Sequence, residues 1–154
     1  FDQVKALPWA QWLTADAKFP ISGKSVRSQL HNEPSIQSVT KKAIVESLKG
    51  PYQRHWFDEN GPEYPVEVSI LKDWVTLSID TSGAGLHKRG YRPEVAAAPL
   101  RETTAAALVL LSYWNRERPF LDPFCGSGTI PIEAAMIARY RAPGANRAFQ
   151  CEQW

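Results

Sequence analysis

One run of sixteen residues, 120–135, carries the residue types that could do chemistry, and it reads FLDPFCGSGTIPIEAA. An apolar stretch leads into Asp122, a turn with Gly126 and Gly128 follows, and an alanine-rich helical pattern begins after Thr129. The two glycines permit backbone conformations that are closed to other residues and let a ligand approach the main chain. The unpaired N–H groups at the start of a helix favour a negatively charged group. We therefore expect a strand, a glycine turn and a helix N-terminus that bind a small molecule with an anionic part.

This turn differs from two common nucleotide-binding loops. A phosphate-binding loop has the pattern G-x-x-x-x-G-K-[ST], but no lysine follows Gly128. A dinucleotide-binding loop needs a third glycine at position 131, which here is Pro131. Because proline suits the first turn of a helix, position 131 indicates the start of a helix and not a pyrophosphate site.

The string D-P-F-C-G-S-G-T resembles the first motif of S-adenosylmethionine-dependent methyltransferases. In that family the glycine loop wraps the methionine end of the cofactor, and the acidic residue that ends the strand, matched here by Asp122, helps to place the amino group. The alternative is an ordinary glycine turn between a strand and a buried helix. We expect Cys125, which lies inside the turn, to be a small buried side chain. The resemblance implies these cofactor-binding residues: Asp122, Pro123, Phe124, Cys125, Gly126, Ser127, Gly128 and Thr129.

The elements that must position this turn are predicted from periodicity. Residues 35–49 form the best helix of the first half, with Ser35 as its cap and Lys49-Gly50-Pro51 as its stop. A strand is expected within 19–30. Two more are expected within 65–80, where apolar and polar residues alternate around a turn at Lys72-Asp73.

The second half predicts two further helices and a boundary. The helix 99–114 has Leu100, Thr104, Leu108 and Leu111 on one face, and the next helix covers 130–140. The loop 81–85 contains two glycines and is a plausible boundary between domains 1–84 and 85–154. Four tryptophans in periodic segments are expected in the core: Trp9, Trp12, Trp74 and Trp114.

Basic residues cluster although the net charge is only +2. Residues 18–54 contain seven lysines and arginines against two acids. A second cluster meets only Glu94 before position 102 and consists of His87, Lys88, Arg89, Arg92 and Arg101. Such clusters form an electrostatic footprint for a phosphate backbone, and Trp56 and Phe57 could stack on unpaired bases. The alternative is a solvated helix face, with Arg92 in a salt bridge to Glu94 or Glu102.

Further strings make the family recognisable. SVTKKAIV at 38–45, together with 19–30, resembles the second half of a THUMP domain. LHKRGYR at 86–92, APLRET at 98–103 and the glycine turn are similar in order and spacing to THUMP-containing RNA guanine-N2 methyltransferases, whose relatives often carry the label of N6-adenine-specific DNA methylase.

The resemblance implies a fold and a function. The fold is an α+β THUMP-like module, followed by the first βα unit of an α/β Rossmann-like S-adenosylmethionine-dependent methyltransferase domain. The implied reaction is methylation of N2 of a guanine in rRNA or tRNA, with Pro99 and Leu100 beside the cofactor. The arginines and lysine of 88–92 either contact RNA phosphate or shape the pocket. The implied RNA-binding residues are Lys24, Arg27, Lys41, Lys42, Lys88, Arg89 and Arg92.

Two expected motifs are absent from the sequence. The enzymes that this sequence resembles hold the amino group to be methylated with an Asn- or Asp-Pro-Pro-aromatic motif, and this sequence has no such string. They also bind the cofactor ribose with an acidic residue at the end of the next strand, and Glu152 comes too early in the chain for that role. We therefore expect a fragment of a larger enzyme that transfers no methyl group by itself; incorporation in a single-turnover assay would contradict this. The rival functions are a non-enzymatic RNA-binding module and an adenine-specific DNA methyltransferase.

Composition sets the broad class. The chain has 154 residues, of which 44% are apolar and 22% charged, as in a soluble globular protein. The longest apolar stretch, 105–111, is far too short for a membrane helix, and there is no signal-peptide pattern. Two cysteines form neither a disulfide framework nor a metal-binding spacing, so we expect no metal and a cytoplasmic location. The oligomeric state is not predicted.

Overall fold

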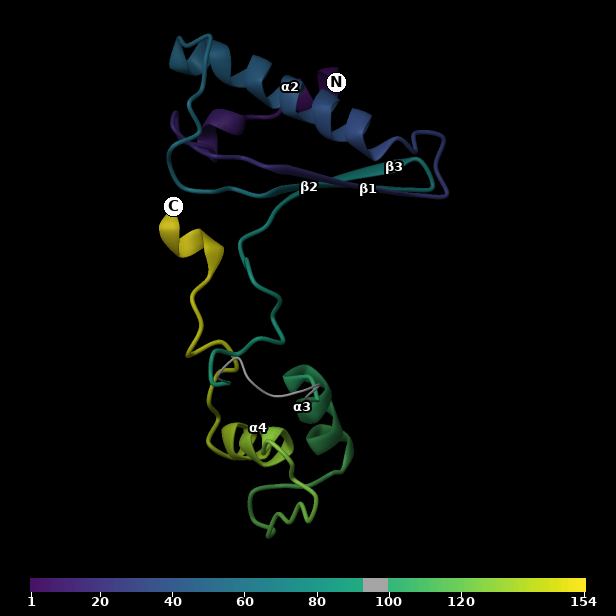
Figure 1. Ribbon diagram of the computed structural model, residues 1–154, viewed down its shortest axis with the longest axis vertical. Helices are drawn as coiled ribbons and strands as arrows, with labels where there is room; N and C mark the ends of the chain where they lie inside the picture. The colour runs from purple at the N-terminus through teal and green to yellow at the C-terminus, as the bar shows by residue number, and fades with distance from the viewer. Residues whose placement is uncertain (93–99) are drawn as a thin grey trace. The chain divides into compact units, whose positions relative to one another are not determined.

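The computed structural model describes residues 1–92 and 100–154 and divides the chain into two compact units. Unit 1 contains Phe1–Gly83 and Phe149–Trp154, and unit 2 contains Ala84–Ala148. Figure 1 shows the chain from its purple N-terminus to its yellow C-terminus.

Unit 1 contains a mixed three-stranded sheet. Its strands are β1 (Ile21–Val26), β2 (Val66–Leu71) and β3 (Trp74–Ile79), in the order β1-β2-β3. β1 pairs with β2 in parallel and β2 pairs with β3 antiparallel, so the three predicted strands and the turn at Lys72-Asp73 are confirmed. The turn needs positive φ at both central residues, and Lys72 and Asp73 adopt 51° and 66° without glycine. The Asp73 carboxylate supports the turn by accepting a hydrogen bond from the Gln29 N–H at 2.7 Å.

One long helix, α2 (Glu33–Tyr52), lies over one face of this sheet (Figure 1). The helix was predicted, but both of its ends differ from the prediction. Asn32 caps the start, because its side chain accepts the Ser35 N–H at 3.0 Å; Ser35 is the residue capped and not the cap. Pro51 lies inside the last turn, and the helix ends at Tyr52. Gln53 is its C-cap, with a left-handed conformation and an N–H that donates to the Gly50 carbonyl.

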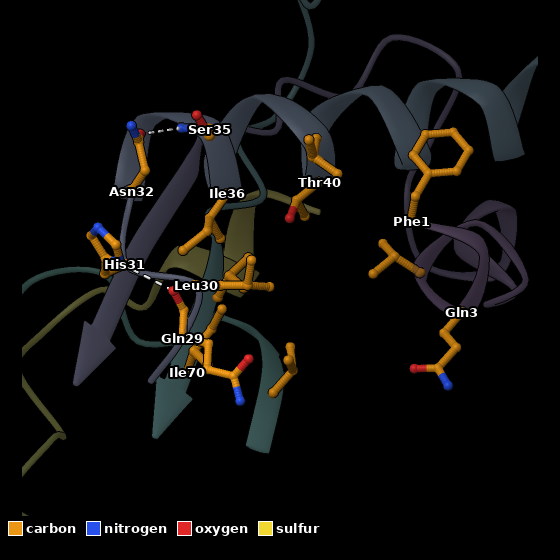
Figure 2. Close-up of a pocket in the computed structure, with 14 residues that line it drawn as sticks. Phe1, Gln3, Gln29, Leu30, His31, Asn32, Ser35, Ile36, Thr40 and Ile70 are labelled. Carbon is orange, nitrogen blue, oxygen red and sulfur yellow. Dashed lines mark hydrogen bonds between the residues drawn. The ribbon is translucent and has the colours of Figure 1, made fainter. Parts of the chain in front are cut away.

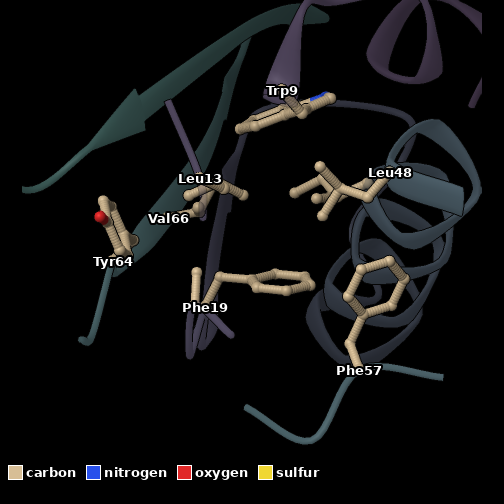
Figure 3. Close-up of a cluster of buried hydrophobic side chains, with 9 residues drawn as sticks. Trp9, Leu13, Phe19, Leu48, Phe57, Tyr64 and Val66 are labelled. Carbon is tan, nitrogen blue, oxygen red and sulfur yellow. The ribbon is translucent and has the colours of Figure 1, made fainter. Parts of the chain in front are cut away.

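The core of unit 1 lies between α2 and the sheet (Figure 3). The short elements α1 (Asp2–Lys5) and η1 (Trp9–Gln11) add to it, and the Trp9 indole, only 2% exposed, donates to the Val4 carbonyl at 2.7 Å. Trp9 was correctly predicted in the core. Phe57 also packs there, so its predicted role in base stacking is wrong, whereas Trp56 is 79% exposed. The labelled core side chains are Trp9, Leu13, Phe19, Leu48, Phe57, Tyr64 and Val66.

Two of the other tryptophans are not in the core. Trp12 is 45% exposed and Trp74 is 82% exposed, so the prediction of burial is wrong for both. The segment η2 (Gln150–Gln153) packs within unit 1, where the Trp154 ring stacks on Tyr64 at 4.5 Å and its indole donates to the Glu63 carbonyl at 3.0 Å. No helix among the described residues is long and apolar enough to cross a membrane.

Unit 2 is built on two helices that pack together, α3 (Glu102–Leu111) and α4 (Thr129–Ala138). Both were predicted, but the predicted face of α3 is wrong: Leu108 and Leu111 are 48% and 72% exposed. The buried face consists of Glu102, Ala105 and Val109. Ala105 and Ala134 of α4 are almost fully buried, which indicates that small side chains, and not the leucines, form the contact between the helices.

The strand expected before the glycine turn is not formed. Residues 119–122 have no regular structure, and Leu121 is 85% exposed. A strand requires a neighbouring strand to satisfy its N–H and C=O groups, and the described residues of unit 2 contain none. Of the βα unit predicted here, the structure therefore contains the turn and the helix.

Candidate functional site

The glycine turn has the backbone that the sequence predicts. Gly126 and Gly128 have φ of 53° and 76°, and the Gly128 N–H donates to the Cys125 carbonyl at 2.8 Å. Gly128 is also the N-cap of α4, and no side chain caps the first N–H groups of this helix. The nearest atom that a Cβ added at Gly126 would meet is the Phe124 carbonyl oxygen at 4.0 Å, so backbone conformation and not space demands glycine there. The main chain of the turn is thus open to close approach by a ligand.

Asp122 supplies a carboxylate at the start of this turn. One of its oxygens, Oδ1, accepts the Phe124 N–H at 3.1 Å. The other, Oδ2, is buried and has no hydrogen-bond partner in the part of the chain that the structure describes. Burying a carboxylate oxygen without a donor costs free energy, and such groups in native proteins call for an explanation. Oδ2 is therefore suited to accept from a cationic group such as an ammonium.

Arg92 ties the exit of the turn to the start of α3. Its guanidinium donates to the Thr129 hydroxyl and to the Leu100 carbonyl, the latter at 3.2 Å. It also lies 3.6 Å from the carboxylate of Glu102, the salt bridge foreseen as one alternative for this arginine. The hydroxyls of Ser127 and Thr129 are 3.1 Å apart. Since Thr129 and Glu102 are both buried, this cluster fixes the base of the glycine turn.

A second buried cluster centres on Glu133 of α4. Its Oε1 lies 3.1 Å from Nε of Arg89 and accepts the Tyr91 hydroxyl at 2.8 Å. Burial raises the pKa of the Tyr91 hydroxyl, and the hydrogen bond to Glu133 raises it further, so this group stays a protonated donor at neutral pH. Because both charged side chains are less than a tenth exposed, the pair holds the 89–92 strip against α4.

The sequence did not identify Glu133 and Glu102 as site residues. A signal was present, because Glu133 is a single acidic residue in an otherwise apolar helix and lies one turn after Thr129 on the same face. A charge at such a position requires a partner from elsewhere in the fold. The identity of that partner, Arg89, depends on tertiary structure.

The other residues predicted to bind cofactor are placed as follows. Phe124 is 92% exposed, and Cys125 is exposed, so the prediction that Cys125 is buried is wrong. Leu100 is 38% exposed and offers its carbonyl to Arg92. Pro99 lies outside the described residues.

The predicted RNA-binding residues fall into two groups. Arg89 and Arg92 are engaged in the buried clusters of unit 2, and the Lys41 ammonium pairs with Glu59 at 2.6 Å and lies over the Phe19 ring. For the two arginines this geometry favours the pocket-shaping alternative. The remaining residues are exposed: Lys24, Arg27, Lys42 and Lys88.

The described residues also line a hollow in unit 1, with a volume of about 470 Å³ (Figure 2). Its walls are mainly aliphatic, including Leu30, Ile36 and Ile70, and they contain no Asp, Glu, Lys or Arg side chain. A ligand with fixed charges finds no counterion among these side chains. The glycine turn is therefore the better site for a charged ligand.

Replacement of Arg92 by alanine is expected to lower the free energy of unfolding by about 2–3 kcal/mol, because Glu102 would remain buried without its counterion. Urea unfolding measures the change. Arg101→Ala is the control, since Arg101 is exposed and its replacement should cost less than about 0.5 kcal/mol. Equal stability of the two variants would show that Arg92 does not hold this site together.

Comparison with known proteins identifies two matching domains. Residues 1–80 match the THUMP domain, and residues 89–153 match the family described as "RMKL-like, methyltransferase domain". The chain is 52% identical, over its full length, to "Putative RNA methyltransferase YpsC" of Bacillus subtilis (strain 168), and it spans 40% of that protein. It is 40% identical over 95% of its length to "Ribosomal RNA large subunit methyltransferase K/L" of Aliivibrio salmonicida (strain LFI1238), of which it spans 21%.

A solved structure shares the fold. The structure titled "SMU.472, a putative methyltransferase complexed with SAH" matches 99% of this chain with a TM-score of 0.90 and 50% identity, and the match covers 41% of that protein. The resemblance inferred from the sequence is therefore confirmed for both parts. The chain belongs to the THUMP-domain family, and its THUMP domain is followed by the start of an RMKL-like methyltransferase domain.

Proposed function

We propose that residues 122–129 bind S-adenosylmethionine. The observation that carries this proposal is the buried Oδ2 of Asp122, which has no donor among the described residues and suits the ammonium group of the cofactor. The open glycine backbone and the uncapped start of α4 support it. The SAH complex of a structure with the same fold supports it further, since SAH is the product that remains after methyl transfer.

The residues of this chain have distinct roles in that proposal. Asp122 would accept from the cofactor ammonium, Gly126 and Gly128 would admit the cofactor to the main chain, and Arg92 would hold Thr129 in place beneath it. When bound, S-adenosylmethionine supplies a methyl group activated by a positively charged sulfonium. Leu100 and Pro99 are proposed to lie beside the cofactor.

Isothermal titration calorimetry with S-adenosylmethionine tests this proposal. Saturable binding is the expected result. The titration uses a protein of the Bacillus relative's full length, and a result without S-adenosylmethionine affinity would favour the alternative, a non-enzymatic RNA-binding module whose glycine turn is only structural.

We further propose that the THUMP domain, residues 1–84, binds structured rRNA or tRNA and that residues 85–154 begin the domain that methylates N2 of a guanine. The chain spans 40% of its Bacillus relative, so the transfer step is proposed for a protein of that relative's length, in the cytoplasm. The THUMP match and the name of the K/L relative support RNA as substrate. The proposed phosphate contacts are Lys24, Arg27, Lys42 and Lys88.

The salt dependence of RNA binding tests these contacts. Each lysine that binds a phosphate releases a counterion, and log K therefore falls as log salt rises. Lys42→Ala should make this negative slope shallower by about 1. Lys41→Ala is a matched control on the same helix, because the Lys41 ammonium is held by Glu59, and its slope should stay as in the wild type. Fluorescence anisotropy with labelled tRNA measures both slopes. Equal effects of the two variants would contradict the assignment of Lys42 as a phosphate contact. If duplex DNA displaces the labelled tRNA as well as unlabelled tRNA does at the same salt concentration, the DNA methyltransferase alternative is favoured.

A further inference from the structure

The face of the unit 1 sheet that points away from α2 carries a row of apolar side chains. Along β2, Val68 and Ile70 point into the core, so Leu71 lies on the opposite face. The register pairs Leu71 with Val26 on β1 and with Trp74 on β3. Residues directly opposite one another on neighbouring strands share a face. Val26, Leu71 and Trp74 therefore form one row across the sheet, named here the Trp74 row.

The Trp74 row is open to solvent. Val26 and Leu71 are each 52% exposed, and the Trp74 side chain is 82% exposed. With strands about 4.8 Å apart, a row across three strands is roughly 10 Å wide. Contiguous exposed apolar side chains of this kind mark a binding surface more often than a stable free surface.

Three cations surround this row. Lys24 lies two residues before Val26 and therefore on the same face, while Arg27 follows Val26 and Lys72 precedes Trp74 in the turn. Within residues 1–92 and 100–154, these three side chains make no ion pair.

Arg27 and Lys72 lie at one corner of the sheet, where residues 26–28 meet residues 72–74, and hydrogen bonds fix the backbone of this corner. The Lys72 N–H donates to the Val26 carbonyl at 3.2 Å, and the Asp73 N–H bonds to the Ser28 hydroxyl at 3.0 Å. Two acids near this corner accept backbone hydrogen bonds: Asp73 from the Gln29 N–H and Glu33 from the Ser25 N–H. The corner thus combines a flat aromatic ring, an apolar floor and unpaired positive charge on an ordered scaffold.

We propose that the Trp74 row binds an unpaired base of single-stranded RNA by stacking, while Lys24, Arg27 and Lys72 bind the flanking phosphates. This inference rests on the RNA binding proposed above, and it adds Trp74 and Lys72 to the contact surface. The positive charge is complementary to a phosphate backbone, and an indole stacks on any base because every base has a π-face. The site should therefore prefer single-stranded over duplex RNA and show little preference among bases.

Binding of a fluorescein-labelled eight-nucleotide single-stranded RNA, measured by anisotropy, tests the inference. Trp74→Ala should weaken binding about 5- to 100-fold, and Trp74→Phe, which keeps a ring, should recover most of the affinity. Trp56→Ala is the matched control, because Trp56 is similarly exposed but belongs to the segment between α2 and β2 and to no strand. It should bind as the wild type does, and circular dichroism would verify that all variants are folded.

The outcomes separate this inference from the proposed function. If the wild type binds RNA but Trp74→Ala binds equally well, or if Trp56→Ala shows the loss instead, the Trp74 row is not the stacking site and RNA binding itself stands. If the wild type binds neither single-stranded nor structured RNA, the proposed RNA binding fails, and the inference fails with it.

Discussion

Replacement of Glu133 by alanine is expected to lower the free energy of unfolding by about 3–5 kcal/mol, a large fraction of what holds an ordinary domain together. The cause is the buried pair: without Glu133, the Arg89 guanidinium, whose side chain is 8% exposed, loses its counterion, and the Tyr91 hydroxyl loses its acceptor. Urea unfolding measures the change. Glu117→Ala is the control, because Glu117 is 80% exposed and its pair with Arg116 should contribute under about 1 kcal/mol.

A double variant separates charge from packing. Arg89→Met combined with Glu133→Leu removes both charges at once, and it should recover most of the stability lost by Glu133→Ala, because an apolar pair can replace a buried ion pair. If Glu133→Ala unfolds at the same urea concentration as Glu117→Ala, the second buried cluster does not hold unit 2 together.

The second large effect is expected on cofactor binding. Asp122→Asn keeps the oxygen that accepts the Phe124 N–H but removes the negative charge proposed to bind the cofactor ammonium. A charge-assisted hydrogen bond contributes about 1.5–3 kcal/mol, so affinity for S-adenosylmethionine should fall about 10- to 100-fold in calorimetric titrations.

Stability distinguishes this role from a structural one. The Asp122 Oδ2 atom has no partner among the described residues, so the asparagine variant should unfold at the wild-type temperature or slightly above it. Unchanged affinity together with lost stability would show that Asp122 shapes the turn and does not bind the ligand. Glu117→Gln serves as the control for a change of net charge.

Local sequence patterns predicted the elements well, because alternation and helical spacing are properties of short segments. The strands β1 to β3, the helices α2 and α4 and the turn at Lys72-Asp73 all follow from them. The cap of α2 was missed by three residues, since Asn32 and Ser35 are both good caps and only the backbone geometry selects between them.

Features that depend on tertiary partners were predicted less well. The leucines of α3 were expected on the face that packs in the fold, but the buried apolar residues of this helix are Ala105 and Val109. Trp74 was assigned to the core from its periodic segment, but periodicity does not reveal which face of a sheet is covered. The salt bridge from Arg92 to Glu102 was foreseen as one alternative, whereas its hydrogen bond to Thr129 required the fold.

The central claim is that the main chain around the glycine turn contacts an S-adenosyl compound. Amide NMR spectra recorded during a titration with S-adenosylhomocysteine test it most directly. The account predicts saturable shifts at the amides of Gly126, Gly128 and Thr129, with little change in unit 1. Shifts confined to residues around the unit 1 hollow, such as Leu30 and Ile36, or no shifts at all, would contradict it.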